Sequence, residues 1–579
     1  SVNNLLKYAE GDNYIHRENI LDINMFYNNW TFYAQVAAGN PPEFGQTNYG
    51  ASQLRIDYQS ENLFVEVGDV YPLWNHGLTL NLRYERNLGY DSGIRGVNAE
   101  YEISRSHRMF GVAGQGDFRH SSPLHNNVRT HDWEATHGVA GIGIRSRPLP
   151  SLGEFTFSGL YVRSRRPYFA LNDNFVPEIN YRTVHSQLYE AAWSQSVSGW
   201  SLLLNHAVQI SRPDEPWSPQ VSNIRPDTVT QSLGHASYVS LSGLVEDVGI
   251  SIEYKNYAYD IRPPAIRNDT YRNWATRMTS VSRPPIVYRE SSATLTSRQT
   301  HIVNYNDEIG FQVELTYYDL FGINLLANYA LSSRHRFYQI RDGIYQVKGE
   351  RTVFPSLDDS FAPFRQAHLK LDRSFFARRL FLKQTFNRFY TVEEYSSRIS
   401  VNDEVTTQRD IANARRALTT LTQIDYTFQS GNSLAIYHEN QWLEWITGAT
   451  TVRDSIGSST VSGTENIRPA YNRFITLSFR HHAGITLSFL YDYASKTEQG
   501  EEFNTDPADD NFIEAGLRDL GVEMRNKWFG VEVTADLFRH HQLTLFYGSE
   551  QGGLRCANGV CREVAPFEDG FKLTLQSYY

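Results

Sequence analysis

The stretch that decides the fold is residues 541–579, which read HQLTLFYGSEQGGLRCANGVCREVAPFEDGFKLTLQSYY. Both ends of this stretch alternate between apolar and polar residues. Because side chains at positions i and i+2 lie on one face of a β-strand, the pattern predicts two strands joined by a loop. The last strand is expected to place one set of residues on its apolar face, namely Phe571, Leu573, Leu575 and Tyr579. Its polar face is expected to carry Lys572, Thr574 and Gln576.

The same alternation recurs along the whole chain. It is clearest over 309–317 and 485–493, and short turn candidates alternate with long polar segments such as 117–133, 164–182 and 391–412. One strand on each side of about eleven short turns, together with a first and a last strand, gives about 24 strands, with an error of about two to four. The pattern therefore predicts an all-β chain with short turns at one edge and long loops at the other.

Composition narrows the class of protein. Aromatic residues make up 13 % of the 579 residues, with 36 Tyr, and mean hydropathy is −0.47. No run approaches the roughly 18 apolar residues of a membrane-spanning helix, which excludes a helical membrane protein. The net charge of −10 comes without a basic stripe, which argues against a nucleic-acid partner.

The apolar faces of these strands need an apolar neighbour, which is either a second sheet or lipid. Tyrosines at the ends of several apolar runs favour lipid, because their amphipathic rings suit the headgroup level. Lipid forbids an open sheet edge. We therefore expect residues 1–579 to form one closed transmembrane antiparallel β-barrel, with short periplasmic turns, long extracellular loops, and lipid against Phe571, Leu573, Leu575 and Tyr579.

The two cysteines give information on the cellular compartment. Cys556 and Cys561 lie in one loop around Asn558-Gly559, and this spacing predicts a disulfide across a tight turn. The competing interpretation, half of a zinc site, lacks a second Cys pair. A disulfide favours an extracytoplasmic location. The chain opens at Ser1 without a charged, apolar leader, as expected for a mature protein whose signal peptide has been removed.

Two stretches carry a resemblance to a known family. The C-terminal run contains a GGL-x-C…G-V-C-R loop and an acidic-glycine entry to the last strand, and Gly68–Val97 reads GDVYPLWNHGLTLNLRYERNLGYDSGIRGV. Both stretches resemble an uncharacterised family of large outer-membrane β-barrel proteins of Bacteroidetes-type envelopes. The resemblance implies the barrel fold and the bacterial outer membrane, and it implies no activity. His76 departs from the small or basic residue expected before Gly77.

Charged residues of both signs concentrate in residues 55–95. The candidates for charges that face the lumen are Asp57, Glu66, Asp69, Arg83, Glu85, Arg86, Asp91 and Arg95. One interpretation is a charged wall that selects solutes. The other is that a polar lumen needs paired charges simply to be filled. The sequence leaves both open.

Catalytic and metal-binding patterns are weak or missing. The pairs His481-His482 and His540-His541 are better explained as polar turn residues than as metal ligands. An acidic segment lacks the spacing of a calcium loop and is better explained as a solvated loop; it contains Glu501, Glu502, Asp506, Asp509 and Asp510. We find no H-E-x-x-H, G-x-S-x-G, phosphate-binding or haem-attachment motif, and so we expect neither an enzyme nor a cofactor.

Two functions fit this description. Strand alternation starts by about residue 18, which leaves no room for the N-terminal plug of TonB-dependent receptors, and a polar inner face without a plug predicts a porin-like passive channel. The alternative is a structural or secretion-associated barrel that holds a lipoprotein or periplasmic partner. In both cases the surroundings are outer-membrane lipid and lipopolysaccharide. Residues 70–92 and 261–300 are candidates for loops that fold into the lumen.

Overall fold

The computed structural model describes residues 1–11, 15–44, 47–120, 133–171, 177–214, 231–261, 278–341, 344–402, 405–447, 451–453, 460–462, 466–496, 526–557, 560–564 and 566–579. Helical elements within these ranges are α2 (Thr294–Arg298) and the 3-10 turns η1 (Arg86–Leu88), η2 (Pro150–Leu152) and η3 (Asp359–Phe361). In the same ranges, no helix is long and apolar enough to cross a membrane.

The described chain folds into one large ring of antiparallel strands. The main sheet holds 26 strands, and all of them except β18 and β19 form a ring of 24 in the described part of the chain. The ring strands are β1 (Val2–Glu10), β2 (Ile15–Tyr27), β3 (Trp30–Gly39), β4 (Asn48–Gln59), β5 (Leu63–Val70), β8 (Ile94–Ser104), β9 (His107–His120), β10 (Trp133–Ser146), β11 (Glu154–Leu171), β12 (Pro177–Val197), β13 (Trp200–Pro213), β14 (Ser232–Val245), β15 (Val248–Ala258), β16 (Glu308–Leu320), β17 (Ile323–Ser333), β20 (Phe364–Phe375), β21 (Leu380–Asn402), β22 (Val405–Thr427), β23 (Ser433–Thr447), β26 (Asn466–His481), β27 (Ile485–Ala494), β28 (Lys527–Leu537), β29 (His541–Glu550) and β32 (Phe567–Tyr578). The predicted strand number is confirmed.

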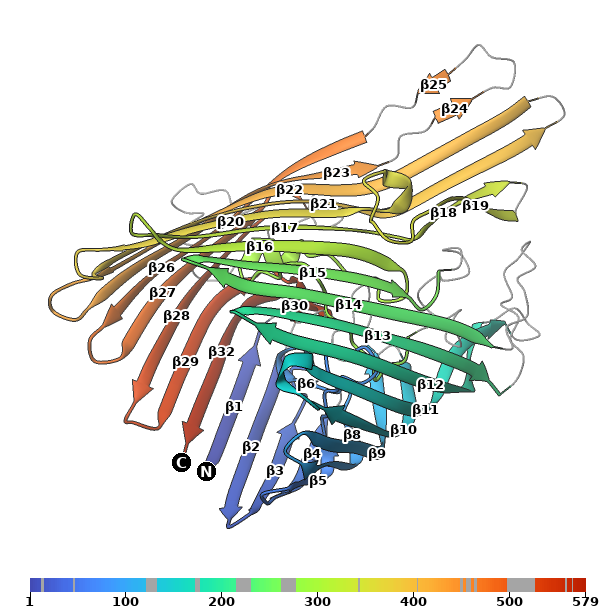
Figure 1. Cartoon of the computed structure of the whole chain (residues 1–579). Helices are drawn as coiled ribbons and strands as arrows, with labels where there is room; N and C mark the ends of the chain where they lie inside the picture. The colour runs from blue at the N-terminus through green and yellow to red at the C-terminus, as the bar shows by residue number, and fades with distance from the viewer. Residues whose placement is uncertain are drawn as a thin grey trace.

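The first and last strands close the ring. β1 pairs antiparallel with β32 from Asn3↔Tyr578 to Glu10↔Phe571, and the Val2 amide donates to the Tyr579 carbonyl at 2.8 Å. The two termini therefore lie side by side at one edge, as Figure 1 shows. Closure removes both free sheet edges, as the predicted closed barrel requires.

The two edges of the ring differ in the length of their connections. At one edge short turns join consecutive strands, such as 28–29, 105–106, 198–199 and 321–322; we call it the short-turn edge. Gly199 has φ +84° with open space around its Cβ position, so its conformation and not crowding requires glycine. The opposite, long-loop edge carries the hairpins β18 (Arg336–Arg341) with β19 (Ile344–Glu350), β24 (Thr451–Arg453) with β25 (Thr460–Ser462), and β30 (Gly553–Ala557) with β31 (Val560–Val564).

Alternate residues of the ring strands face outward and form an apolar belt. Val67 of β5 and Val97 of β8 are cross-strand partners and are 46 % and 41 % exposed. Other exposed apolar residues of the belt are Leu54, Ile142, Phe157, Leu204, Ile252, Leu315, Phe386, Leu418, Leu477 and Phe489. Such a belt is the surface by which a transmembrane β-barrel contacts lipid.

The buried core of the protein lies inside the ring. Two connections from the long-loop edge fold inward: residues 71–93, which include β6 (Tyr84–Glu85), η1 and β7 (Tyr90–Asp91), and residues 278–307, which include α2. We call them the first and second plug segments. Trp74, Leu80 and Leu82 of the first segment cluster with Val281 of the second and with strand residues Ile94, Phe110, Val112, Val139, Leu160, Val162 and Leu188. The sequence suggested that residues 70–92 and 261–300 fold into the lumen. The structure confirms this for residues 71–92 and for the described part of the second range, 278–300.

Candidate functional site: the plugged lumen

The first plug segment is fastened to the ring by a buried carboxylate. Glu190 of β12 accepts hydrogen bonds from the Thr79 hydroxyl and, at 2.8 Å, from the Asn205 side chain of β13. Tyr259 donates its hydroxyl to the Leu78 carbonyl at 2.9 Å. Buried polar groups of this kind are stabilising only when they are paired, so these contacts fix where the tip of the segment lies.

An ion pair holds the same segment against β2. Arg86 lies 3.2 Å from the carboxylate of Asp22 on β2, and Tyr33 and Gln35 of β3 also donate to that carboxylate, at 3.0 and 2.7 Å. Arg86 is thus one of the predicted luminal charges, and its partner lies 64 residues earlier in the chain.

The second plug segment is anchored at its helix. Glu439 of β23 accepts the backbone amides of Thr294 and Leu295 at 2.7 and 2.8 Å. At the other end of α2, Arg298 forms an ion pair with Asp492 of β27 at 2.6 Å. One carboxylate therefore satisfies two amides that a helix start leaves unpaired.

A buried lysine joins the middle of the second segment to the point where that segment returns to the ring. Lys255 of β15 donates to the Ile286 carbonyl at 2.5 Å and pairs with Glu308, where the segment rejoins the ring, at 2.7 Å. Both side chains are almost fully buried, at 1 % and 4 % exposure. Removing Glu308 would leave the Lys255 ammonium buried without its ion-pair partner, which is strongly unfavourable.

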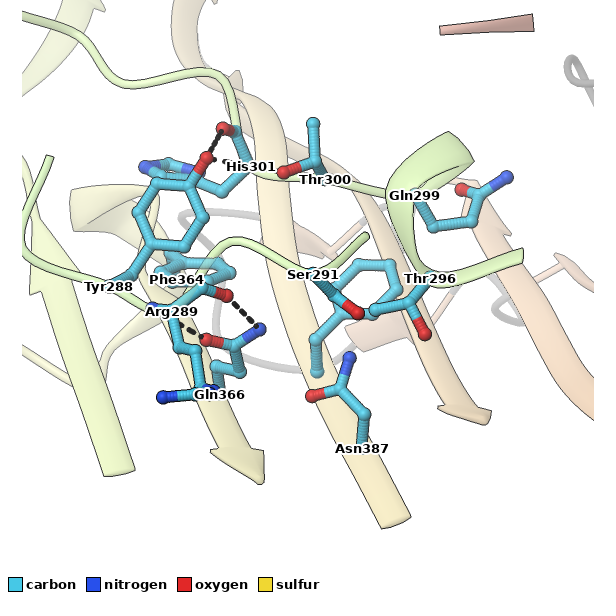
Figure 2. A pocket seen from close by; sticks show the side chains of 11 residues that line it. Tyr288, Arg289, Ser291, Thr296, Gln299, Thr300, His301, Phe364, Gln366 and Asn387 are labelled. Carbon is cyan, nitrogen blue, oxygen red and sulfur yellow. Dashed lines mark hydrogen bonds between the residues drawn. The ribbon is translucent and has the colours of Figure 1, made fainter. Parts of the chain in front are cut away.

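The contact between the second segment and β20 is close-packed (Figure 2). The Arg289 amide and carbonyl exchange hydrogen bonds with the Gln366 side chain at 3.2 and 3.1 Å, and Tyr288 donates to the His301 carbonyl at 3.0 Å. The His301 ring stacks on Phe364 with centroids 4.2 Å apart. The pocket left between them is about 10 Å³, which is room for about one water molecule.

The two plug segments are also hydrogen-bonded to each other. The Arg283 amide donates to the Gly77 carbonyl at 2.9 Å, and the Asn81 amide donates to the Val281 carbonyl at 2.8 Å. The Asn81 side chain donates to the Arg283 carbonyl at 3.0 Å. The two segments therefore form one connected body across the lumen.

Cavities lie on both sides of this body. A cavity of about 660 Å³ is lined by the second segment and by residues near the long-loop edge, including Phe118, Ala135 and Ser333. A cavity of about 370 Å³ is lined by Asn75 and His76 of the first segment and by residues that flank short turns, such as Glu154 and Ser196. Burial lowers the pKa of His76, so its ring is neutral at pH 7.

Tyr305 lines the larger cavity and carries a buried hydroxyl group that lacks a partner in the described chain. Its hydroxyl is buried and has no hydrogen-bond partner within the described ranges, and its ring lies 5.8 Å from the Arg283 guanidinium carbon. Burial raises the pKa of Tyr305 to about 12, so the hydroxyl is a protonated donor at neutral pH.

The other predicted charges of residues 57–91 lie in two groups. On the strands, Asp57 lies 2.8 Å and Glu66 lies 3.8 Å from Arg55. In the first plug segment, Arg83 and Glu85 form a pair at 3.5 Å. Asp91 of that segment accepts from the Tyr71 hydroxyl at 3.3 Å. Paired charges therefore fill this part of the barrel.

Asp69 and Arg95 differ from the luminal position predicted for them. They are cross-strand partners, 3.2 Å apart, in the outward register of Val67↔Val97, whereas the next pair, Val70↔Ile94, is buried inside. Arg95 is 72 % exposed. Asp69 lies two residues after the outward Val67, and Arg95 lies two residues before the outward Val97, so the period of two places both on the outward face. Charge alone, which suggested the lumen, does not decide the face.

The predicted disulfide is present. Cys556 and Cys561 are joined in the β30–β31 hairpin, and Arg562 of that hairpin donates to the Leu88 carbonyl of the first plug segment at 2.8 Å.

The terminal strand β32 has one more exposed and one more covered face. Phe571 is 38 % exposed, while Lys572 lies over the ring of buried Phe567. Leu573 and Leu575 share the register face of Phe571 and are half-buried, and Tyr579 is exposed.

The candidate metal ligands do not gather into a site where they are described. No group of three or more His, Cys, Asp or Glu side chains that suits a metal ion occurs within the described ranges. The rings of His481 and His482 are in contact at a tilt of 46°, and His541 is hydrogen-bonded to the Ser577 hydroxyl at 2.8 Å. The acidic segment Glu501–Asp510 lies outside the described residues.

Comparisons with known proteins give little beyond this geometry. No protein-family model and no curated protein matches the sequence. Solved structures similar to the whole chain include the ferric enterobactin receptor PfeA from Pseudomonas aeruginosa, in a mutant form with enterobactin bound (10 % identity, TM-score 0.42, 81 % of that chain), the copper transporter OprC (9 %, 0.43, 82 %) and the ferric citrate transporter FecA (10 %, 0.41, 78 %). The strand pairing of this chain defines its fold, and similarity at these values assigns it no function.

Proposed function

We propose that this chain is an outer-membrane barrel for the gated passage of polar solutes, in which the two plug segments form the gate. The observation that carries the proposal is the pair of cavities, about 660 and 370 Å³, on the two sides of a plug that is held by discrete polar contacts in addition to an apolar cluster. Such contacts can break and re-form as units, whereas a purely apolar core has no comparable release points. On this proposal, the barrel would act as the porin-like passive channel expected from the sequence only when the plug is removed.

Planar-bilayer conductance tests this proposal. Val70 and Ile94 face each other in the β5–β8 register, so an Asn-Gly turn can replace residues 71–93 without disturbing the ring. We expect the wild-type barrel to be closed for most of the recording and the deletion variant to give long-lived conductance steps. The matched control replaces 337–349 by the same turn between Arg336 and Glu350, which are also register partners, and should stay closed.

Two outcomes would contradict the gate. Steady conductance of the wild-type barrel would support a passive channel. Silence of the deletion variant would support the second candidate function, a scaffold whose filled lumen holds a lipoprotein or periplasmic subunit. The scaffold predicts that such a subunit copurifies in mild detergent.

A further inference from the structure

Arg283 lies where the two plug segments meet, and no carboxylate of the described residues forms an ion pair with it. Its guanidinium carbon lies over two aromatic rings, 4.8 Å from the centre of Tyr90 and 5.8 Å from that of Tyr305. Its Nη2 atom donates to the Tyr90 hydroxyl at 3.1 Å, whereas its buried Nη1 atom has no acceptor in the described chain. A buried cation without a counter-charge is unfavourable, so this position favours an anion.

A second unpaired donor lies beside this guanidinium. The Tyr305 hydroxyl is buried and has no hydrogen-bond partner among the described residues. Arg283 and Tyr305 both line the cavity of about 660 Å³. Buried donors without an acceptor are rare in folded proteins and costly to keep. Two of them in one cavity wall therefore indicate a site at which a ligand supplies the acceptors.

The carboxylates of the same wall are already paired. Each of the three that are described has a basic partner of its own: Asp307 has His335, Glu308 has Lys255, and Glu393 has Arg415. Glu290 also attracts the Arg283 charge, but it does so without forming an ion pair with it. A further arginine of the lining, Arg334, is set against Glu290. The positive charge that this balance leaves is that of Arg283.

Other parts of the cavity wall are apolar. Phe118 and Ala135, which are cross-strand partners on β9 and β10, contribute to it together with Ile302 and Val303 of the second plug segment. Ile302 is 52 % exposed although it belongs to a plug segment. The volume falls in the range of about 300–1,000 Å³ that is typical of small-molecule sites. The wall therefore suits a ligand that has an apolar body as well as a charged end.

We propose that this cavity binds a small organic monocarboxylate with an apolar body, and that its carboxylate accepts hydrogen bonds from Arg283 Nη1 and the Tyr305 hydroxyl. The inference rests on the proposed function, for which it names the class of solute. A guanidinium group presents N–H donors that suit carboxylate oxygens. A single uncompensated charge favours a monoanion, and the carboxylates in the same wall repel a dianion.

The test measures equilibrium binding to the purified full-length chain in detergent by titration calorimetry at neutral pH. The probes are phenylpropionate and its neutral isostere phenylpropionamide. We expect the wild type to bind the carboxylate about tenfold tighter than the amide or better, and Tyr305→Phe to weaken carboxylate binding by about tenfold. Arg283→Gln should abolish the preference for the carboxylate over the amide. Heat-dependent gel mobility verifies that each barrel is folded.

The matched control is Tyr257→Phe. Tyr257 is the neighbouring buried tyrosine, and its hydroxyl already donates to the Pro285 carbonyl at 2.6 Å. This variant should bind phenylpropionate as the wild type does. Equal losses in Tyr257→Phe and Tyr305→Phe would overturn the proposal, because they would assign the effect to the stability of the plug.

Three other results would also overturn it. Equal affinity of the wild type for the carboxylate and the amide would remove the anion from the recognition. Unchanged binding in Tyr305→Phe would remove the hydroxyl from the site. Full competition by an equal concentration of inorganic phosphate would make the cavity a general oxyanion site. Binding is measured here without any conductance, so failure of this site is distinguishable from failure of the gate, which appears in the planar bilayer.

Discussion

At the scale of single residues, buried polar groups decide how firmly the plug is held. Tyr305 and Tyr257 are neighbouring buried tyrosines with ring centroids 6.3 Å apart, yet only Tyr257 has a partner for its hydroxyl, the Pro285 carbonyl at 2.6 Å. An unpaired buried hydroxyl costs about 1–3 kcal/mol, whereas a paired one contributes about 1 kcal/mol. Tyr305→Phe should therefore leave the unfolding midpoint in detergent unchanged or raise it, and Tyr257→Phe should lower it. A clear loss of stability in Tyr305→Phe would show that its hydroxyl has a partner in solution.

Glu439 leads to a second prediction at this scale. Glu439→Ala removes the acceptor of two helix amides, at a cost of about 1–3 kcal/mol. We expect faster hydrogen exchange at residues 294–298, with little change in the ring strands. The control is Glu444→Ala, which removes the partner of Arg416, a residue with an exposed side chain, and should cost less than about 1 kcal/mol. Unchanged exchange at 294–298 would mean that Glu439 does not hold α2.

At the scale of elements, the β30–β31 hairpin is a separate clip on the plug. A disulfide that closes so short a loop stabilises by about 2 kcal/mol on the chain-entropy model. Replacing Cys556 and Cys561 by Ser should speed exchange over 553–564 and at Leu88, which Arg562 contacts, while the β29–β32 ladder keeps its protection. Loss of protection in β29 or β32 would show that ring closure depends on the hairpin.

At the scale of the whole molecule, the ring is closed by one pairing. Deleting residues 2–10 removes β1 and leaves edges on both β2 and β32, which lipid does not tolerate. We expect this variant to lose the heat-dependent gel mobility of a closed barrel. Deleting the β18–β19 hairpin, which lies outside the ring, should preserve that mobility. A folded, heat-modifiable barrel without β1 would mean that β2 can pair with β32.

Much of the architecture could be predicted from the sequence, and much of the site could not. Period-two alternation and turn spacing are local properties, so strand number and the cysteine pairing follow from residues close together in the chain. Ring closure follows from a general rule, because lipid allows no open sheet edge. The plug contacts pair residues far apart, as Glu190 with Thr79, Glu439 with α2, and Asp22 with Arg86. In the sequence, Glu190 and Glu439 are two of many polar residues in alternating strands, and no local pattern distinguishes them from the others.

The sequence by itself determined that the chain is a closed β-barrel with an apolar outer face, because each strand carries its own two-faced pattern. The tertiary structure decided that the lumen is plugged and which charges face it. These depend on register and on loop direction. A shift of one residue moves a side chain to the other face, and whether a long loop turns inward depends on partners that lie hundreds of residues away.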